Sequence, residues 1–155
     1  MTEPAPRIER AGLADLEALL PLFVAYRRFY GRADEPRARD FLAERLQREE
    51  SVVFIAWRGA EAIGFTQLYP SFASVSLGPM FVLYDLFVAP GARRCGVGAL
   101  LLRRAVRYAT EQGAVELMLQ TATDNRAAQR LYEREGWVRD EEFYVYNYRP
   151  QVTRG

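Results

Sequence analysis

The stretch from Met80 to Thr121 constrains the fold of this chain more than any other part of the sequence. Residues 80–88 (MFVLYDLFV) form a nearly continuous apolar run, which indicates a strand buried on both faces, and Pro90-Gly91 ends it. After a glycine-bearing turn, apolar residues recur at helical spacing until Gly113, and residues 115–121 predict a further strand. A strand, a helix and a second strand make one βαβ unit.

The segments on either side of this unit predict further strands and helices. Residues 7–10 predict a short first strand, residues 13–31 a helix, residues 32–36 a polar linker, and Phe41, Leu42 and Leu46 a second amphipathic helix. Ser51–Trp57 and Ala62–Tyr69 predict an antiparallel hairpin that turns at Arg58-Gly59. Asp124 or Asn125 can cap a fourth helix that stops before Gly136, and the alternation in Phe143–Tyr148 predicts a closing strand.

Together these elements predict an α+β fold. We expect a mixed, mostly antiparallel central sheet of about six to seven strands flanked by about four helices. The chain has 155 residues, half of them apolar, and no internal repeat or linker between domains, so we expect residues 1–155 to form a single domain. No stretch of about 18 apolar residues is present and Met1–Arg10 has no apolar core, which predicts a cytoplasmic protein without a membrane partner.

Composition excludes several classes of function. The chain has no histidine and no lysine, which rules out Ser-His-Asp triads, Cys-His dyads, Schiff-base chemistry and the lysine-bearing phosphate loop. Cys95 is the single cysteine, so we expect neither a disulfide nor a metal site. The net charge of +1 gives no bulk electrostatic reason to expect a nucleic acid as partner.

The first motif with chemical content is Arg93-Arg94-Cys95-Gly96-Val97-Gly98, between the buried strand and the strong helix. Unpaired N–H groups and the helix dipole make a helix N-terminus an anion site, and glycine lets phosphate oxygens approach the backbone closely. The two arginines can add charge-assisted hydrogen bonds. A plain turn with two solvated arginines is the competing interpretation, and the residues alone leave both open.

The second motif is Asn125-Arg126-Ala127-Ala128-Gln129-Arg130-Leu131-Tyr132. Asn125 and Tyr132 are seven residues apart and therefore share one helix face. A tyrosine with its ordinary pKa near 10 is protonated at neutral pH, so Tyr132 can act as a general acid toward a departing thiolate. An N-capping asparagine and a packing tyrosine are the alternative, and it also stays open.

Both motifs resemble signatures of the GNAT superfamily of N-acetyltransferases. RRCGVG is similar to R/Q-x-x-G-x-G/A, and NRAAQRLYEREGW is similar to N-x-x-A-x-x-L-Y-x-x-x-G-W/F, in the same order and at typical separation. The resemblance implies acetyl-CoA as co-substrate. It implies that Arg93, Arg94, Cys95, Gly96, Val97, Gly98 and Ala99 wrap the pyrophosphate, that Phe87 and Val88 pair with pantetheine, that Asn125 and Ala128 hold the cofactor, and that Tyr132 lies by its sulfur.

Within the superfamily, Tyr26-x-x-Phe29-Tyr30 and YDLFV look most like the Hpa-type enzymes that acetylate histones and polyamines, and like diamine acetyltransferases. Those diamine enzymes carry a glutamate, proposed as base, where this chain has Tyr84. The base is then Asp85, another carboxylate or a water chain, and we choose Asp85. Tyr26, Phe29, Tyr30, Tyr69 and Tyr84 can form aromatic walls for a cation, with Asp34, Glu35 or Asp85 supplying charge; the same aromatics can equally be core.

The predicted function is N-acetyl transfer to a primary amine of a small molecule, such as a polyamine or an amino acid. The amine attacks directly in a ternary complex, with Tyr132 as acid and Asp85 as base, and Cys95 is not an acyl carrier. The alternatives are a non-catalytic acyl-CoA sensor and an enzyme acting on a protein or charged-tRNA amine, the latter through Arg103, Arg104 and Arg107. Phe143, Tyr144, Val145, Tyr146 and Tyr148 can supply an interface, and we expect a homodimer.

Overall fold

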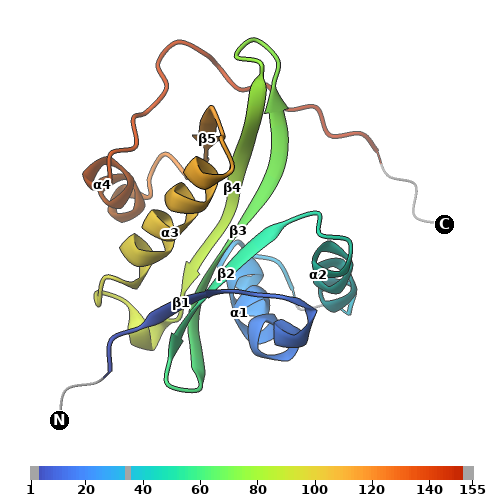
Figure 1. Ribbon diagram of the computed structural model, residues 1–155, viewed down its shortest axis with the longest axis vertical. Helices are drawn as coiled ribbons and strands as arrows, with labels where there is room; N and C mark the ends of the chain where they lie inside the picture. The colour runs from blue at the N-terminus through green and yellow to red at the C-terminus, as the bar shows by residue number, and fades with distance from the viewer. Residues whose placement is uncertain (1–3, 34–35, 152–155) are drawn as a thin grey trace.

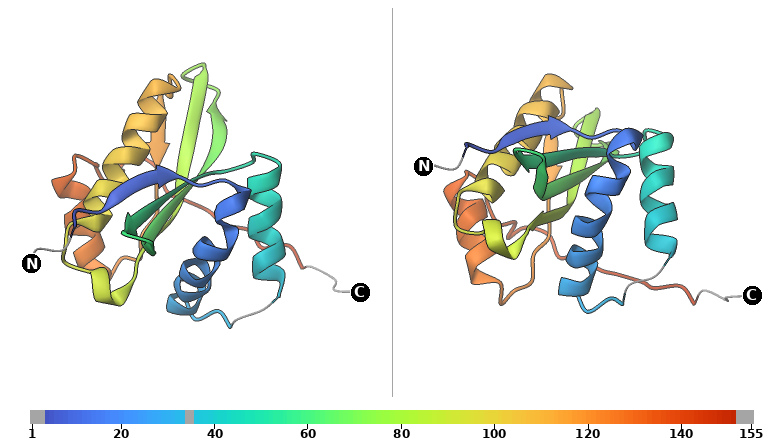
Figure 2. Two further views of the ribbon diagram at one scale, coloured as in Figure 1. Left: turned by 60° about the horizontal axis from the view of Figure 1, so that its bottom comes forward. Right: turned by 90° about the horizontal axis from the view of Figure 1, so that it is seen from below.

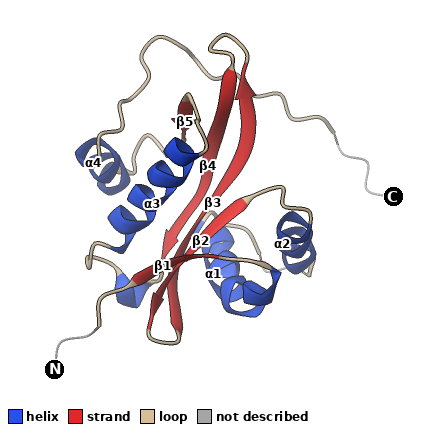
Figure 3. Ribbon diagram, viewed as in Figure 1, coloured by secondary structure: helices blue, strands red, loops and turns tan. Residues whose placement is uncertain are grey.

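The computed structural model describes residues 4–33 and 36–151. Within these residues the centre of the molecule is a twisted sheet of five strands, which follow one another across the sheet in chain order (Figures 1 and 3). The first four are antiparallel neighbours, and the fifth runs parallel to the fourth. The strands are β1 (Arg7–Arg10), β2 (Val52–Arg58), β3 (Glu61–Ala73), β4 (Gly78–Val88) and β5 (Glu116–Met118).

Helices cover both faces of the sheet, as Figure 2 shows. One face carries α1 (Leu16–Phe29), which is entered through a short 3-10 turn at Leu13–Asp15, and α2 (Arg37–Gln47); the other carries α3 (Val97–Glu111) with α4 (Arg126–Arg134) beside it. The predicted α+β architecture, with its mixed sheet and four helices, is confirmed. Asp34 and Glu35, two of the predicted charges of the substrate site, lie outside the described residues.

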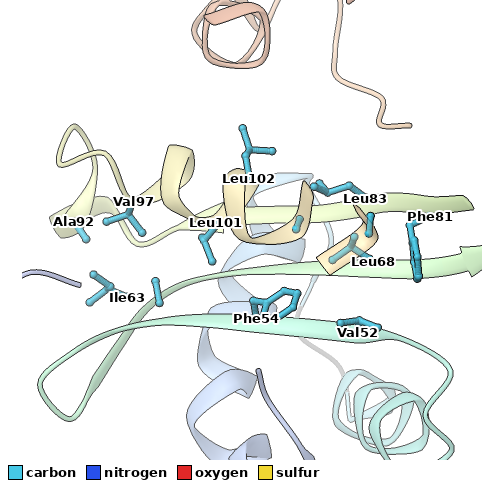
Figure 4. Close-up of a cluster of buried hydrophobic side chains, with 13 residues drawn as sticks. Val52, Phe54, Ile63, Leu68, Phe81, Leu83, Ala92, Val97, Leu101 and Leu102 are labelled. Carbon is cyan, nitrogen blue, oxygen red and sulfur yellow. The ribbon is translucent and has the colours of Figure 1, made fainter. Parts of the chain in front are cut away.

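Each face of the sheet has its own apolar core, because the side chains of a strand alternate between the two faces. On the α3 face, Leu101 and Leu102 are fully buried against Phe54 and Leu68 (Figure 4). On the α1–α2 face, the buried side chains include Leu19, Leu42, Val53, Ile55, Phe65 and Phe87. Truncating a fully buried leucine to alanine typically costs about 2–5 kcal/mol, so these two layers hold the sheet and helices together.

β4 differs from the expected strand in how it is buried. Its pairing with β3 shifts register between Gln67 and Leu68: Gln67 is opposite Asp85, Leu68 is opposite Leu83, and Tyr84 is the extra residue of a β-bulge. Tyr84 is 67% exposed, so the prediction of a strand buried on both faces is wrong at this position. The bulge also moves Asp85 onto the α1–α2 face of the sheet, together with Phe87.

β5 is shorter than the predicted strand over residues 115–121. It pairs with β4 only where Glu116–Met118 lies beside Met80–Val82. From Leu83 onward β4 has a partner strand on one side only, because β4 and β5 diverge. The sheet therefore opens at the carboxyl end of β4, next to the start of α3 (Figure 1).

The predicted closing strand at Phe143–Tyr148 is wrong for a single copy of the chain. These residues have no regular secondary structure, and Phe143, Tyr144, Val145, Tyr146 and Tyr148 are 61% to 91% exposed. After α4 the described chain runs past the sheet to the opposite side of the molecule (Figures 1 and 2), and residues 143–148 pair with none of the described strands. For this reason the described sheet has five strands rather than six to seven.

No helix in the described part of the chain is long and apolar enough to cross a membrane.

Candidate active site

The turn between β4 and α3 has an unusual backbone. Arg94 and Gly96 have φ values of +68° and +76°, in the left-handed region, and Gly96 is the N-cap of α3. The first helical hydrogen bond runs from the N–H of Leu100 to the carbonyl oxygen of Gly96. Within the described chain no side chain caps this helix, so the N–H groups of its first turn are available to an anion.

Gly96 and Gly98 make different contributions to this turn. A Cβ atom at Gly96 would meet nothing within 4 Å, so glycine is required there by the backbone angle and leaves open space in front of the amides. A Cβ atom at Gly98 would lie 3.2 Å from Cδ2 of Leu131, so this glycine lets α4 approach α3 closely. The open cradle at Gly96 fits a pyrophosphate group.

A groove of about 520 Å³ lies where the sheet opens. It is bounded by the end of β4, the turn before α3, and α4. The predicted cofactor residues that line it are Phe87, Val88, Arg93, Arg94, Gly96, Val97, Gly98, Ala99, Asn125, Ala128 and Tyr132, and of the predicted substrate residues Phe29 and Tyr30 also line it. Cys95 is exposed and does not line the groove.

Arg93 is turned back toward the sheet. Its Nε donates a hydrogen bond of 3.0 Å to the carbonyl oxygen of Val88, and its guanidinium lies 5.6 Å from the ring centre of Phe87. The side chain therefore ties the turn to the end of β4, while Arg94 is exposed at the rim of the groove. We expected both arginines to face an anion, and the structure gives Arg93 a second role in holding the shape of the turn.

Asn125 and Tyr132 both lie on the groove side of α4. The Oδ1 atom of Asn125 accepts a hydrogen bond from the N–H of Ala128 at 3.2 Å, so Asn125, and not Asp124, caps the helix. Burial raises the pKa of Tyr132, and the neighbouring Tyr30 raises it further. The phenol of Tyr132 therefore keeps its proton at neutral pH and can donate it in the groove.

A buried carboxylate lies on the α1–α2 face of β4. Asp85 is 2% exposed, and its carboxylate accepts a hydrogen bond of 2.5 Å from the side-chain amide of Gln67 across the β3–β4 ladder, with the hydroxyl of Tyr26 close by. Burial raises the pKa of Asp85 to about 6, although the hydrogen bond from Gln67 and the nearby hydroxyl of Tyr26 lower it. A carboxylate with a pKa of about 6 is ionised at neutral pH yet basic enough to take up a proton.

Aromatic side chains surround Asp85 and connect it with the groove. The rings of Tyr69 and Tyr84 are in edge contact, with their centres 5.7 Å apart. The hydroxyl of Tyr26 donates a hydrogen bond of 3.1 Å to the carbonyl oxygen of Tyr84. The ring of Tyr26 lies 5.2 Å from that of Tyr30, which lines the groove. Burial followed by the charge of Asp85 raises the pKa values of both Tyr26 and Tyr69. We name Tyr26, Gln67, Tyr69, Tyr84 and Asp85 the Asp85 cluster.

The sequence-based site and the structural site overlap without coinciding. Tyr26, Tyr69, Tyr84 and Asp85 do not line the groove, and Tyr26 also packs on Phe65 of the apolar core. Sequence reasoning missed Gln67, although a polar residue inside the apolar strand IGFTQL was a usable signal. It also missed part of the groove lining, namely Leu86, Ala92, Thr121, Ala127, Leu131 and Arg134.

Among the described residues no group of three or more His, Cys, Asp or Glu side chains can hold a metal ion.

Comparison with known proteins identifies the family. The acetyltransferase (GNAT) family matches residues 16–137. "Uncharacterized N-acetyltransferase YhfO" of Bacillus subtilis (strain 168) is 47% identical over 140 residues, which cover 90% of this chain and 94% of that protein. The crystal structure of a probable acetyltransferase has 44% identity and a TM-score of 0.89, and the match covers 94% of this chain and 99% of that one.

A more distant relative has a named substrate. "Aminoglycoside N(6')-acetyltransferase type 1" of Salmonella typhimurium (strain LT2) is 28% identical over 109 residues, covering 68% of this chain and 75% of that protein. The extent of the family match and the identity to the Bacillus protein, taken with a glycine turn that leaves helix amides open beside a tyrosine-bearing groove, place this chain in the GNAT family of acetyl-CoA-dependent N-acetyltransferases.

Proposed function

We propose that this protein transfers an acetyl group from acetyl-CoA to a primary amine of a small molecule by direct attack in a ternary complex. The observation that carries the proposal is that one groove joins the uncapped N-terminus of α3, which can bind an anion, to the protonated phenol of Tyr132. The Asp85 cluster borders this groove through Tyr26 and Tyr30. An anion cradle, an acid and a base are the groups that thioester aminolysis requires.

The turn before α3 is the proposed site of the CoA pyrophosphate. The backbone N–H groups of Val97, Gly98 and Ala99 would bind its oxygens, and the exposed Arg94 would add charge from the rim. The unpaired side of β4 near Phe87 and Val88 would hold the pantetheine arm as an added strand, since β5 has diverged at that point. Acetyl-CoA supplies the activated thioester when it is bound.

Asp85 is the proposed base. An alkylamine is mostly protonated at pH 7 and must lose a proton before it can attack. With no histidine in the chain, the raised pKa of Asp85 makes this carboxylate the acceptor best matched to neutral pH. The hydroxyl of Tyr26 lies close to Asp85, and the ring of Tyr26 contacts Tyr30 in the groove lining, so this hydroxyl would provide a route for the proton from the groove.

Tyr132 is the proposed acid. Its phenol lines the groove, and its raised pKa keeps the proton in place until a thiolate leaves. The proton then passes from the phenol oxygen to the departing sulfur, and solvent restores the phenol. Cys95 has no part in this scheme, because it is exposed outside the lining of the groove.

The acceptor is proposed to be a small molecule with a positively charged group. Tyrosine faces attract cations, and the carboxylate of Asp85 complements their charge. Gln67 adds an acceptor, because its Oε1 atom is buried and has no hydrogen-bond donor within the described residues. The aminoglycoside acetyltransferase among the relatives acts on a molecule of this chemical class.

A charged tRNA is a weaker candidate for the acceptor. It would need a basic surface, and Arg103, Arg104 and Arg107 were the candidates. Arg103 is paired with Glu135 at 2.8 Å, Arg107 lies 3.9 Å from Glu111, and Arg104 stacks on Phe54. We therefore favour the small amine as acceptor. The cytoplasm is the proposed location of the reaction.

The test combines calorimetry with acetyl-CoA and an assay for free CoA thiol over a panel of polyamines, amino acids, aminoglycosides and peptides. Binding followed by thiol release with a small amine is expected. Binding without release over the whole panel would instead indicate an acyl-CoA sensor. A folded protein that binds neither CoA nor acetyl-CoA would overturn the proposal at its base.

A further inference from the structure

The outer edge of β4 carries free backbone groups where the sheet opens. The N–H of Ala89, directly after the strand, donates to the carbonyl oxygen of Ile63 on β3 at 2.8 Å. A Cβ atom at Gly64 of β3 would lie 3.0 Å from the carbonyl oxygen of Phe87, so Phe87 also faces β3. Successive residues of a strand direct their backbone groups to opposite edges. Val88 therefore faces the outer edge of β4, from which β5 has diverged.

The side chain of Arg93 occupies this outer edge. Its Nε donates to the carbonyl oxygen of Val88 at 3.0 Å, and its guanidinium lies 5.6 Å from the ring centre of Phe87. An N–H group at about this distance from an outer carbonyl is what the next strand of a sheet would supply. Arg93 is exposed, and Arg93 and Val88 both line the groove. The guanidinium therefore takes the place of one backbone donor of an added strand.

Arg93 and the pantetheine arm of CoA need the same carbonyl oxygen. This step rests on the proposed function, in which the outer edge of β4 holds that arm as an added strand. Pantetheine contains two secondary amides, each with one N–H donor and one carbonyl acceptor. Because Arg93 approaches Val88 from the outer edge, as an added strand would, its Nε and an amide N–H compete for one position. The edge is fully open to an amide only after Arg93 has left Val88.

A diphosphate offers Arg93 a stronger partner than Val88. Arg93 lies three residues before Gly96, the N-cap of α3, whose first-turn amides form the proposed cradle. In the free protein its guanidinium is held by a neutral carbonyl and an aromatic ring. A guanidinium that binds phosphate oxygens forms charge-assisted hydrogen bonds, which are about twice as strong as those between neutral groups. An anion in the turn would therefore draw Arg93 away from β4.

We propose that Arg93 is a positioning residue with two positions, which couples the two ends of the CoA site. Without a ligand, its guanidinium covers the carbonyl oxygen of Val88 and closes the outer edge of β4. With a diphosphate in the turn before α3, it leaves Val88 and binds the phosphate oxygens. The edge is then open to an amide. The two halves of CoA therefore favour each other's binding although they contact different parts of the groove.

The test measures the binding of two fragments of CoA, separately and together. ADP supplies the diphosphate and pantetheine supplies the two amides, and each is titrated into isotope-labelled protein by NMR, alone and with the other at saturation. In the wild-type chain, ADP should raise the affinity for pantetheine by about three- to tenfold, the value of one hydrogen bond. In Arg93→Met, pantetheine alone should bind tighter than to the wild type by the same factor. ADP should bind this variant more weakly and give no further gain.

Arg94→Met is the matched control, because it removes the other cation of the turn. ADP should bind it more weakly and should still raise its affinity for pantetheine as in the wild type. Weaker binding of pantetheine to Arg93→Met would show that Arg93 only holds the shape of the turn. Fragments that bind the wild type independently of each other would also overturn the coupling, without the need for any variant. A wild-type chain that binds neither fragment nor CoA would overturn the proposed function itself, so the two failures are distinguishable.

Discussion

Gln67 donates its side-chain amide hydrogen to the carboxylate of Asp85 from the directly opposite position on the neighbouring strand. The two residues are fully or almost fully buried, and one of them is titratable. Burial disfavours the ionised form of Asp85, and the amide of Gln67 favours it. The balance between these two effects sets the pH at which the carboxylate can accept a proton.

Replacing Asp85 with asparagine should stabilise the protein while removing its activity. The pKa of Asp85 is about 6 in the folded state, against 3.8 for an exposed aspartate. Ionisation of Asp85 therefore begins to destabilise the fold as the pH rises above 3.8, and the destabilisation reaches its full size above pH 6. The cost at pH 8 is on the order of 3 kcal/mol. We expect Asp85→Asn to gain about 1–3 kcal/mol in urea unfolding at pH 8 and close to nothing at pH 4. Its turnover should fall by about 10²-fold or more. Equal stability of the two proteins at pH 8 would contradict the burial argument.

The pH dependence of kcat/KM should report on the same group. As the pH falls through about 6, Asp85 becomes protonated and the rate should decline. Gln67→Met keeps the volume and removes the hydrogen bond that lowers the pKa, so the acidic limb should move to higher pH. Tyr84→Phe is the matched control, because Tyr84 is not among the causes of the shift, and its limb should stay in place. A limb that does not move in Gln67→Met would exclude a positioning role for Gln67.

Tyr132→Phe removes one hydroxyl from the groove and leaves the ring in place. Turnover should fall by about 10²-fold, because the leaving thiolate loses its proton donor. The dissociation constant for acetyl-CoA, measured by calorimetry, should change little. Tyr108→Phe, which alters a tyrosine of the α3 core outside the groove, should retain full turnover. Unchanged turnover in Tyr132→Phe would show that the proton comes from elsewhere.

Gly96→Ala tests the phosphate cradle against a matched turn glycine. Gly96 and Gly59 have φ values of +76° and +60°, and a Cβ atom at either position would meet nothing within 4 Å. Each alanine variant should lose about 1 kcal/mol of stability through backbone strain. Only Gly96→Ala should also weaken CoA binding, by about tenfold or more, since its methyl group projects toward the pyrophosphate and shifts the helix amides. Equal CoA affinity in the two variants would place the pyrophosphate elsewhere.

Local patterns predicted most of the elements of the fold. Gly59 marks the hairpin turn, the spacing of Val97, Leu101 and Ala109 gives α3, and Asn125 caps α4, because each signal depends on residues close together in the chain. The strand predicted at Phe143–Tyr148 is absent from the described structure. Alternation is a property of the segment alone, and it does not predict which sheet edge the segment would pair with. The sequence pattern therefore predicts a strand without predicting whether a sheet edge is available to pair with it.

The candidate site was predicted in part for the same reason. The glycine turn and Tyr132 belong to contiguous motifs and were found. Gln67 and Asp85 come together only through the register in which β3 pairs with β4, and the sequence of neither strand alone predicts that register. The run MFVLYDLFV has no regular alternation because the bulge at Tyr84 changes which side chains face α3. On the N-terminal side of the bulge these are Phe81 and Leu83, and on the C-terminal side they are Leu86 and Val88.

That single extra residue at position 84 determines which of the two cores receives a charge. If β4 kept every residue but lost the bulge, the side chain at position 85 would point toward Leu101 and Leu102, where a charged oxygen would meet only hydrocarbon. Deletion of Tyr84 would instead leave Asp85 opposite Gln67 and on the same face as before. The carboxylate can therefore survive loss of the residue beside it, whereas a one-residue slip in the pairing of β3 with β4 would turn it into the wrong core.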